Sequence, residues 1–404
     1  MIVFFVGNML MSFGGLMLTI IVARLLGPVE YGVYGSLIGL LYFLTIPVAT
    51  LDLIVTKSIS SFSENKILGN TKAFLFYLWT KFGKLCLLML PLILMLSFLI
   101  RDYLHIDNII SLWVLWFLVY LNVLTSIFTG VLKGMLKFNA VVINLLSSMA
   151  IRMVSSIVFI MWFIQGHLGG LFGVLVSLLG GIGLFCYQLR QVWLAKMVKV
   201  NISGLNLRKL GMAGLITTGA FSSMYSLDIV FVRHYLSGYE SGLYVSLATA
   251  GKMIFFSISP IAIALLPIVS RKAKESFLAR KDLLKLLGLT VAIGMCGIVG
   301  FSLFPEMIIN TIFSSKFSES AQYLPAFGIV MFLYSLTNVL GSFLMALNRF
   351  RASIWILFGL GVEIVLLNIY HHTIWEVIWS LGLVFLALSL VLLVQSWYAT
   401  EKNP

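Results

Sequence analysis

Six ionisable residues lie within, or at the ends of, long apolar segments. They are Asp52, Lys57, Arg152, Asp228, Lys252 and Glu363. An ionised side chain near the middle of a membrane span costs roughly 2.5–3.5 kcal/mol, so each such group should face a wet cavity or an opposite charge. Two roles are therefore open: the lining of a transport path, or ion pairs that join helices. In the second role, Arg152 or Lys252 would pair with Asp228 or Glu363.

The segments that carry these residues have the length and composition of membrane spans. Of the 404 residues, 61% are hydrophobic and only 10% are charged, which is far too little charge for a soluble protein of this size. The first segment lacks a basic start and a small-residue cleavage site, so we expect a membrane helix rather than a signal peptide. Hydropathy predicts twelve spans, near 3–23, 33–55, 82–100, 109–130, 140–163, 169–189, 210–232, 242–269, 286–304, 322–345, 353–370 and 374–397.

The basic residues indicate how these spans are oriented. Most lie in alternate loops, as Lys72, Lys137, Lys199 and Lys281 do, whereas the opposite loops are rich in acidic residues. The positive-inside rule then places both termini in the cytoplasm and predicts a multi-pass protein of the plasma or inner membrane. The net charge of +13 is thus a topology signal, and we expect no nucleic-acid partner.

Residues capable of metal or redox chemistry form no convincing site. The three cysteines lack disulfide or zinc spacing and are interpreted as small core residues. They are Cys86, Cys186 and Cys296. His371 and His372 lie close to Glu376, but adjacent histidines on a short loop are usually solvated. We expect no metal and no cofactor.

A repeated motif divides the chain in two. Glu-x-Gly-x-Tyr occurs at residues 30–34 and again at 240–244, and "LKGMLKFNA" (132–140) returns as "LMALNRFRA" (344–352). Both echoes fall after equivalent spans. The sequence therefore predicts two six-helix halves, 1–200 and 201–404. Because six is even, both halves enter the membrane in the same direction, which makes a parallel repeat with a cavity between the halves.

The repeated motif marks an outer hairpin, for which we favour a structural role over substrate contact. Gly27 and Pro28 should break the first helix, and Gly32 should sit where a side chain would crowd the turn. Glu30 would complement a helix dipole, and the tyrosines suit the membrane interface. The candidate hairpin and gating residues are Arg24, Glu30, Gly32, Arg233, Glu240 and Gly242.

Two stretches resemble a known family. "ARLLGPVEYGVYGSL" (23–37) resembles the first hairpin of the polysaccharide biosynthesis flippases, and "DIVFVRHYLSGYESGLYVSLATAGK" (228–252) with "LLPIVS" (265–270) resembles their seventh and eighth helices. That family shares a superfamily with MATE multidrug exporters and lipid II flippases. The resemblance implies an all-α, polytopic, MATE-like fold with about 12 transmembrane helices. Twelve spans suit an O-antigen-type or exopolysaccharide flippase, because lipid II flippases usually carry fourteen.

The resemblance also implies a function. Such proteins move a polyprenyl-pyrophosphate-linked oligosaccharide from the inner to the outer leaflet by alternating access. Arg152 and Lys252, from opposite halves, would contact the pyrophosphate, with Lys57 and Asp52 as further substrate contacts. Asp228 and Glu363 would be sugar hydroxyl acceptors or ion-coupling groups. Expected partners are membrane lipids and the glycosyltransferases and polymerase of the same pathway.

Two alternatives are kept. A MATE-type exporter of small cations shares the architecture. A membrane-embedded polysaccharide polymerase or ligase belongs to another class and usually has a large, charged outer loop, whereas the longest outer loop here, about 305–321, has no charge cluster. The chain also lacks a Gly-x-x-x-x-Gly-Lys phosphate loop. We therefore expect a transporter rather than an enzyme.

Overall fold

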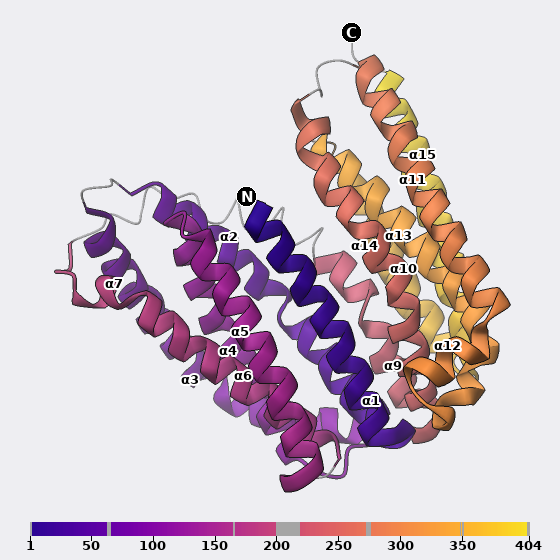
Figure 1. The fold of residues 1–404 in the computed structure, drawn as a ribbon, viewed down its shortest axis with the longest axis horizontal. Helices are drawn as coiled ribbons and strands as arrows, with labels where there is room; N and C mark the ends of the chain where they lie inside the picture. The colour runs from indigo at the N-terminus through magenta and orange to yellow at the C-terminus, as the bar shows by residue number, and fades with distance from the viewer. Residues whose placement is uncertain are drawn as a thin grey trace. The chain divides into compact units, whose positions relative to one another are not determined.

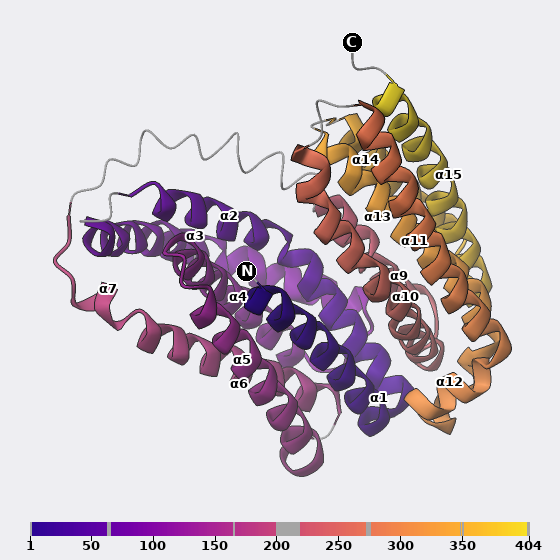
Figure 2. The same ribbon diagram turned by 45° about the horizontal axis from the view of Figure 1, so that its top comes forward.

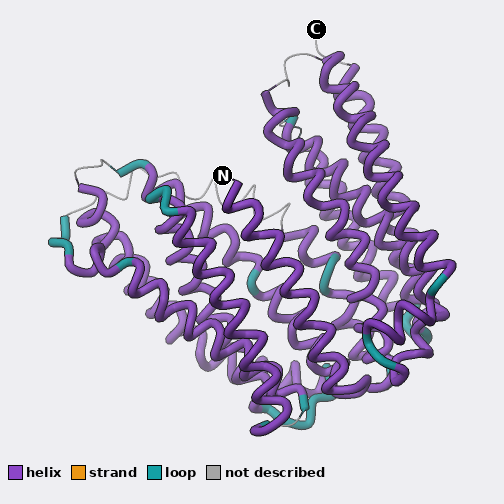
Figure 3. The backbone as a smooth tube through the Cα atoms, in the orientation of Figure 1, coloured by secondary structure: helices purple, strands orange, loops and turns teal. Residues whose placement is uncertain are grey.

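The computed structural model describes residues 2–62, 66–164, 166–198, 219–271, 276–347, 349 and 351–401. Figure 3 shows helix along nearly all of these residues, joined by short turns and without a strand. Contacts group the chain into two compact units, Met1–Leu26 with Leu37–Leu215, and Gly27–Ser36 with Ile216–Pro404. The all-α membrane fold expected from the composition is confirmed.

The N-terminal unit is built around one central helix, α4. Its helices are α1 (Ile2–Leu44, shared with the other unit), α2 (Ile46–Ser60), α3 (Ile67–Tyr103), α4 (Ile110–Gly134), α5 (Phe138–Val158, continued by a π-helical turn at Phe159–Phe163), α6 (His167–Gln188) and α7 (Arg190–Leu194). α4 packs against α2, α3, α5 and α6, and Figures 1 and 2 show this bundle in indigo to magenta.

Close packing of α5 on α6 depends on small residues, as the "GGLFG" spacing of α6 predicts. A Cβ added at Gly173 would lie within 2.1 Å of the Ser156 hydroxyl oxygen, and one at Gly169 would lie 2.3 Å from the carbonyl oxygen of Ile164. Any side chain larger than hydrogen would push these two helices apart.

The C-terminal unit has its own central helix, α13. Its helices are α9 (Leu227–Tyr235), α10 (Gly238–Arg271), α11 (Ser276–Leu303), α12 (Pro305–Ile312), a 3₁₀ segment (Ser315–Tyr323), α13 (Leu324–Ala346), α14 (Arg351–Ile369) and α15 (Ile374–Glu401). α13 packs against α10, α11, α14 and α15. The sequence repeat predicts that spans four and ten are equivalent, and these spans correspond to α4 and α13.

The predicted spans coincide with helices wherever the structure describes them. By length and composition, the described residues contain nine helices able to cross a membrane. One of them, Phe13–Ser60, merges predicted spans one and two. The span at 82–100 lies within α3, and residues 210–218 of span seven lie outside the described residues. Gly27, at φ 74°, breaks α1 just before Pro28, as expected.

Two expectations about burial were wrong. Cys186 and Cys296 are free and exposed rather than in the core, because apolar helices such as α6 and α11 carry small apolar residues at exposed positions too. The side chain of Cys86 lies outside the described part of the chain. Tyr34 and Tyr244 are not interfacial either, since they are only 4% and 0% exposed.

Candidate functional site

A polar stripe follows one face of α4 inside the N-terminal unit. Asn122, Thr125, Thr129 and Lys133 recur at helical spacing, and all four side chains are half-buried within a candidate membrane span. The hydroxyls of Thr125 and Thr129 donate to carbonyl oxygens one turn back, at 2.9 and 2.8 Å. This satisfies their donors in an apolar span, while each hydroxyl oxygen can still accept a hydrogen bond.

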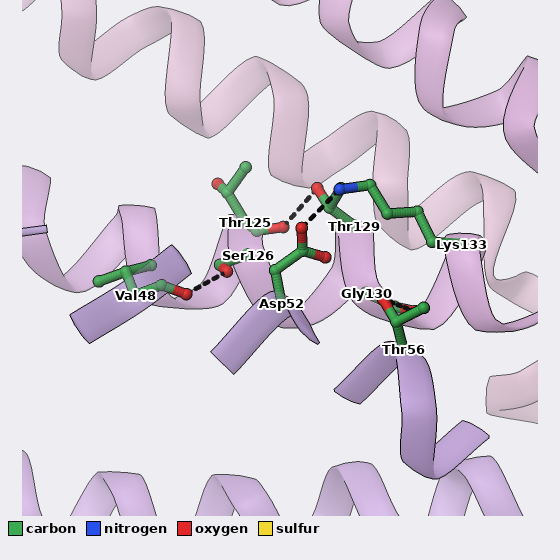
Figure 4. Close-up of polar contacts among 8 residues, drawn as sticks. All are labelled: Val48, Asp52, Thr56, Thr125, Ser126, Thr129, Gly130 and Lys133. Atoms are coloured by element: carbon green, nitrogen blue, oxygen red, sulfur yellow. Dashed lines mark hydrogen bonds and ion pairs between the residues drawn. The ribbon is translucent and has the colours of Figure 1, made fainter. Parts of the chain in front are cut away.

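The charged end of this stripe is an ion pair. Lys133 donates to Asp52 of α2 with 2.5 Å between Nζ and Oδ2, and the two side chains are 24% and 22% exposed (Figure 4). The other carboxylate oxygen of Asp52, Oδ1, is buried and has no hydrogen-bond partner among the described residues. Asp52 thus keeps one acceptor oxygen, Oδ1, available at membrane depth beside the polar stripe of α4.

Two glycines of α4 explain why this pair forms. A Cβ added at Gly130 would lie 2.9 Å from the carbonyl oxygen of Asp52, and one at Gly134 would lie 2.9 Å from that of Thr56. α2 and α4 therefore approach closely enough for polar cross-links. Figure 4 shows two of these, from Ser126 to the Val48 carbonyl at 2.8 Å and from Thr56 to the Gly130 carbonyl at 3.3 Å.

The other cations predicted for the N-terminal half occupy different positions. Lys57 is exposed in the last turn of α2, and Arg152 is half-buried near the middle of α5. Lys133 is not among the site residues predicted from the sequence. Its position one helical turn below the polar series of α4 is the signal that could have identified it.

Three residues of the C-terminal unit form a buried polar cluster with two tyrosines. Asp228 of α9 is 2% exposed and accepts a hydrogen bond from the Tyr244 hydroxyl of α10 at 2.7 Å. The Lys252 ammonium, also on α10, lies 3.9 Å from the ring centroid of Tyr225, in a cation–π contact. Asp228 is within electrostatic range of both Lys252 and Glu363.

Glu363 is the least satisfied member of this cluster. It is 1% exposed on α14, and neither carboxyl oxygen has a hydrogen-bond partner among the described residues. Within the described part of the chain, Lys252 makes no direct ion pair with Glu363 or Asp228. A buried carboxyl group without a donor is costly when charged. The cluster is therefore suited to hold a proton or a small cation.

The two copies of the hairpin motif lie against each other within the C-terminal unit. A Cβ added at Gly242 would lie 1.8 Å from the carbonyl oxygen of Pro28, and one at Gly32 would lie 2.9 Å from the backbone nitrogen of Gly242. Tyr31 and Thr249 share a buried hydrogen bond of 3.0 Å beside this contact. A side chain at Gly32 would thus be crowded by the other copy of the motif.

The charged residues of the two hairpins differ in their exposure and in their partners. Ser237 and Glu240 form a reciprocal cap, since the Ser237 N–H donates to the Glu240 carboxylate at 3.1 Å and the Glu240 N–H donates to the Ser237 hydroxyl at 3.2 Å. Glu30 is half-buried, Arg24 is exposed and Arg233 is buried. The second copy of the motif therefore begins α10 with a structural cap.

The adjacent histidines between α14 and α15 form ring contacts. His371 lies on Tyr235 with ring centroids 3.8 Å apart, and Glu376 accepts a hydrogen bond from the backbone N–H of His372 at 2.9 Å. Among the described residues, no three histidine, cysteine or acidic side chains gather as metal ligands would.

The fold is that of MOP superfamily transporters. The chain resembles an inward-facing MATE family multidrug transporter with a TM-score of 0.79, 12% identity and coverage of 98% of this chain and 96% of that one. It also resembles the lipid II flippase MurJ, with a TM-score of 0.71, 15% identity and coverage of 98% and 87%. A MOP superfamily transporter from Pyrococcus furiosus matches with a TM-score of 0.65, 15% identity and coverage of 100% and 95%.

Sequence comparison gives the family. The model of the polysaccharide biosynthesis protein family matches residues 21–322, and the chain belongs to that family. It is also 24% identical over 282 residues to an uncharacterized membrane protein of Methanocaldococcus jannaschii, a match that spans 65% of each chain. The protein is thus a multi-span membrane protein of the polysaccharide biosynthesis protein family.

Proposed function

We propose that the protein moves a polyprenyl-pyrophosphate-linked oligosaccharide from the inner to the outer leaflet of the plasma membrane. The observation that carries this proposal is the polar stripe of α4. A sugar headgroup crossing about 30 Å of hydrocarbon unaided loses several kcal/mol for each unsatisfied polar group. Half-buried amide and hydroxyl side chains at membrane depth, at Asn122, Thr125 and Thr129, can replace the hydrogen bonds that the sugar gives up.

We assign the pyrophosphate contact first to Arg152. A guanidinium group can bind phosphate oxygens through two parallel hydrogen bonds, and it remains charged at every physiological pH. Lys252 was the other sequence candidate, but its ammonium makes a cation–π contact with Tyr225 and is attracted by Asp228 within its own unit. Lys252 therefore serves better as a fixed charge of the buried C-terminal cluster, while Lys57 and Asp52 remain proposed contacts at the inner end of α2.

We assign ion coupling to Asp228 and Glu363. Binding a proton or a cation there would relieve the unpartnered carboxyl oxygens of the cluster and could bias the arrangement of α9, α10 and α14. The polar stripe of the N-terminal unit would then bind the sugar hydroxyls.

We also propose that both termini face the cytoplasm, on the basis of the alternating basic loops. A cysteine that replaces Asp107 should then react with an impermeant thiol reagent from outside, and one that replaces Lys281 should react from the cytoplasmic side. Reaction of both cysteines from the same side would reject this topology.

The fold likeness to MATE transporters favours one second candidate, export of small cations. Proteoliposomes separate the two functions. In one set, a lipid-linked oligosaccharide is loaded, and its appearance at the opposite leaflet is measured with an impermeant glycosidase. In the other set, uptake of a cationic dye is followed. We expect headgroup transfer and no dye transport.

A matched pair of variants ties that transfer to the α4 stripe. Thr125→Val with Thr129→Val removes two hydroxyls at constant shape and should slow headgroup transfer. Thr80→Val makes the same change at an exposed position of α3 and should not. Dye transport without headgroup transfer would reject the flippase proposal.

A further inference from the structure

A cavity of about 460 Å³ opens in the N-terminal unit between α3, α4, α6 and α7. This volume lies within the ~300–1,000 Å³ usual for small-molecule sites. Its wall is mainly apolar and includes Phe76, Trp79, Phe128 and Trp193. Because α4 and α6 are candidate spans, the cavity lies at membrane depth. Water finds too few polar partners in such a space, which suits it to hydrocarbon.

One end of the cavity carries a fixed positive charge. Lys72 of α3 lines the wall, and its ammonium donates to the carbonyl oxygens of Trp193 and Ala195, at 2.6 and 2.9 Å. These two bonds hold the end of α7 over the cavity. An ammonium group has three donors, so one N–H of Lys72 is left for an anion at this end.

The segments around this end of the cavity carry charge of one sign only, which is positive. The chain has no aspartate or glutamate between Asp107 and Asp228, a stretch that includes α4, α6 and α7. Within it, Arg190 begins α7 and Lys196 follows α7. The cavity is apolar along its length and cationic at one end. It therefore matches an amphiphile with an anionic head.

We propose that this cavity binds one acyl chain of an anionic membrane phospholipid, with the lipid phosphate at Lys72. The lipid would stay bound and would not be transported. It would hold α7, and hence the start of the basic connection between the two halves, against the membrane. The site is separate from the polar α4 stripe assigned to the substrate.

Native cysteines provide the test. Cys186 is exposed and lines the cavity, whereas Cys296 is exposed on α11 and does not. The full chain carrying Cys86→Ser is placed in nanodiscs of phosphatidylcholine, with or without phosphatidylglycerol, and the rate of reaction with a membrane-soluble maleimide is measured. Phosphatidylglycerol at roughly ten times its Kd should slow labelling of Cys186 about tenfold and leave Cys296 unchanged.

Two glycine variants sharpen the result. An added Cβ meets no atom within 4 Å at either Gly83 or Gly15, and only Gly83 lines the cavity. Gly83→Leu should fill the cavity and abolish the effect of phosphatidylglycerol on Cys186, whereas Gly15→Leu should retain it. Lys72→Gln should also abolish the lipid effect, through the charge.

Three outcomes would overturn the proposal. The first is equal labelling of Cys186 in both kinds of nanodisc. The second is continued protection by phosphatidylglycerol in Gly83→Leu. The third is protection by a polyprenyl phosphate but not by phosphatidylglycerol, which would assign the cavity to the lipid carrier of the substrate. A failure of the flippase proposal alone would leave phosphatidylglycerol protection intact.

Discussion

At the scale of single residues, the ion pair between Asp52 and Lys133 joins α2 to α4 at membrane depth. Lys133→Met should destabilise the protein by roughly 1–3 kcal/mol, below the ~3–5 kcal/mol of a fully buried pair because water still reaches both side chains. Adding Asp52→Asn should recover part of this loss, since no lone charge then remains. Thermal unfolding of the two single variants and the double variant gives the coupling, and strictly additive losses would show that the pair contributes nothing.

Arg152 is the residue on which substrate recognition depends most. Arg152→Ala should abolish headgroup transfer while the protein still reaches the membrane, and Arg152→Lys should restore transfer only in part, because one ammonium cannot make two parallel bonds to phosphate. Transfer is measured in proteoliposomes at matched protein levels. Normal transfer by Arg152→Ala would place the site elsewhere. Recovery of function by combining Arg152→Ala with Glu363→Gln would instead make these two residues a structural pair.

Glu363 tests the assignment of ion coupling. Glu363→Gln keeps the shape of the side chain but can no longer bind a proton or a cation, so headgroup transfer should lose its dependence on an imposed proton or sodium gradient. Glu306→Gln, in the first turn of α12, is a control that should keep any such dependence. A gradient dependence that survives in Glu363→Gln would remove Glu363 from the coupling role.

The sequence identified the costly charges but could not assign their partners. Hydropathy alone places Asp52, Asp228 and Glu363 in apolar segments. Which cation approaches each of them depends on how helices distant in the sequence pack, and that depends on glycines such as Gly130, whose contacts are not local. The pairing of Asp52 with Lys133 and the separation of Lys252 from Glu363 were therefore beyond sequence reasoning.

At the scale of elements, the close contact between the two Glu-x-Gly-x-Tyr hairpins depends on Gly242. Gly242→Ala should destabilise the protein by about 1–3 kcal/mol, because its Cβ would overlap the Pro28 carbonyl and the two hairpins would have to separate. Gly300→Ala in α11 is the control, since nothing lies within 4 Å of its added Cβ, and it should gain about 0.5–1 kcal/mol through helix propensity. Equal effects of the two substitutions on the unfolding temperature would contradict a tight hairpin contact.

The helices themselves were predictable because long apolar runs leave the backbone of a membrane protein few alternatives. The break at Gly27 followed from the Gly-Pro pair. The sequence did not predict that the two hairpin motifs contact each other, because the repeat shows that they are equivalent and gives no distance between them. Burial of Tyr244 depended on Asp228 as a hydroxyl partner, and that pairing bridges α9 and α10.

At the scale of the whole molecule, contacts group the chain into two compact units, while the division into two repeated halves, 1–200 and 201–404, stays a prediction of the sequence. In each unit a central helix packs against most of its neighbours: α4 against α2, α3, α5 and α6, and α13 against α10, α11, α14, α15 and the 3₁₀ segment Ser315–Tyr323. The N-terminal unit carries the polar stripe, and the C-terminal unit carries the buried acidic cluster. We propose that the N-terminal unit binds the headgroup and that the C-terminal unit couples transport to an ion. The protein would alternate between an inward-open and an outward-open state and so carry the substrate across the membrane.

Closure of the outer hairpins gives the most direct test of this mechanism. An added Cβ at Gly238 would lie 3.5 Å from Cγ1 of Val29, so cysteines at these two positions lie within reach of a disulfide. The double variant, with the native cysteines replaced by serine, is placed in proteoliposomes that contain a lipid-linked oligosaccharide. Oxidation should stop headgroup transfer, reduction should restore it, and Val29→Cys alone should be unaffected. Transfer at the normal rate by the fully oxidised protein would contradict a mechanism in which these two hairpins must separate during transport.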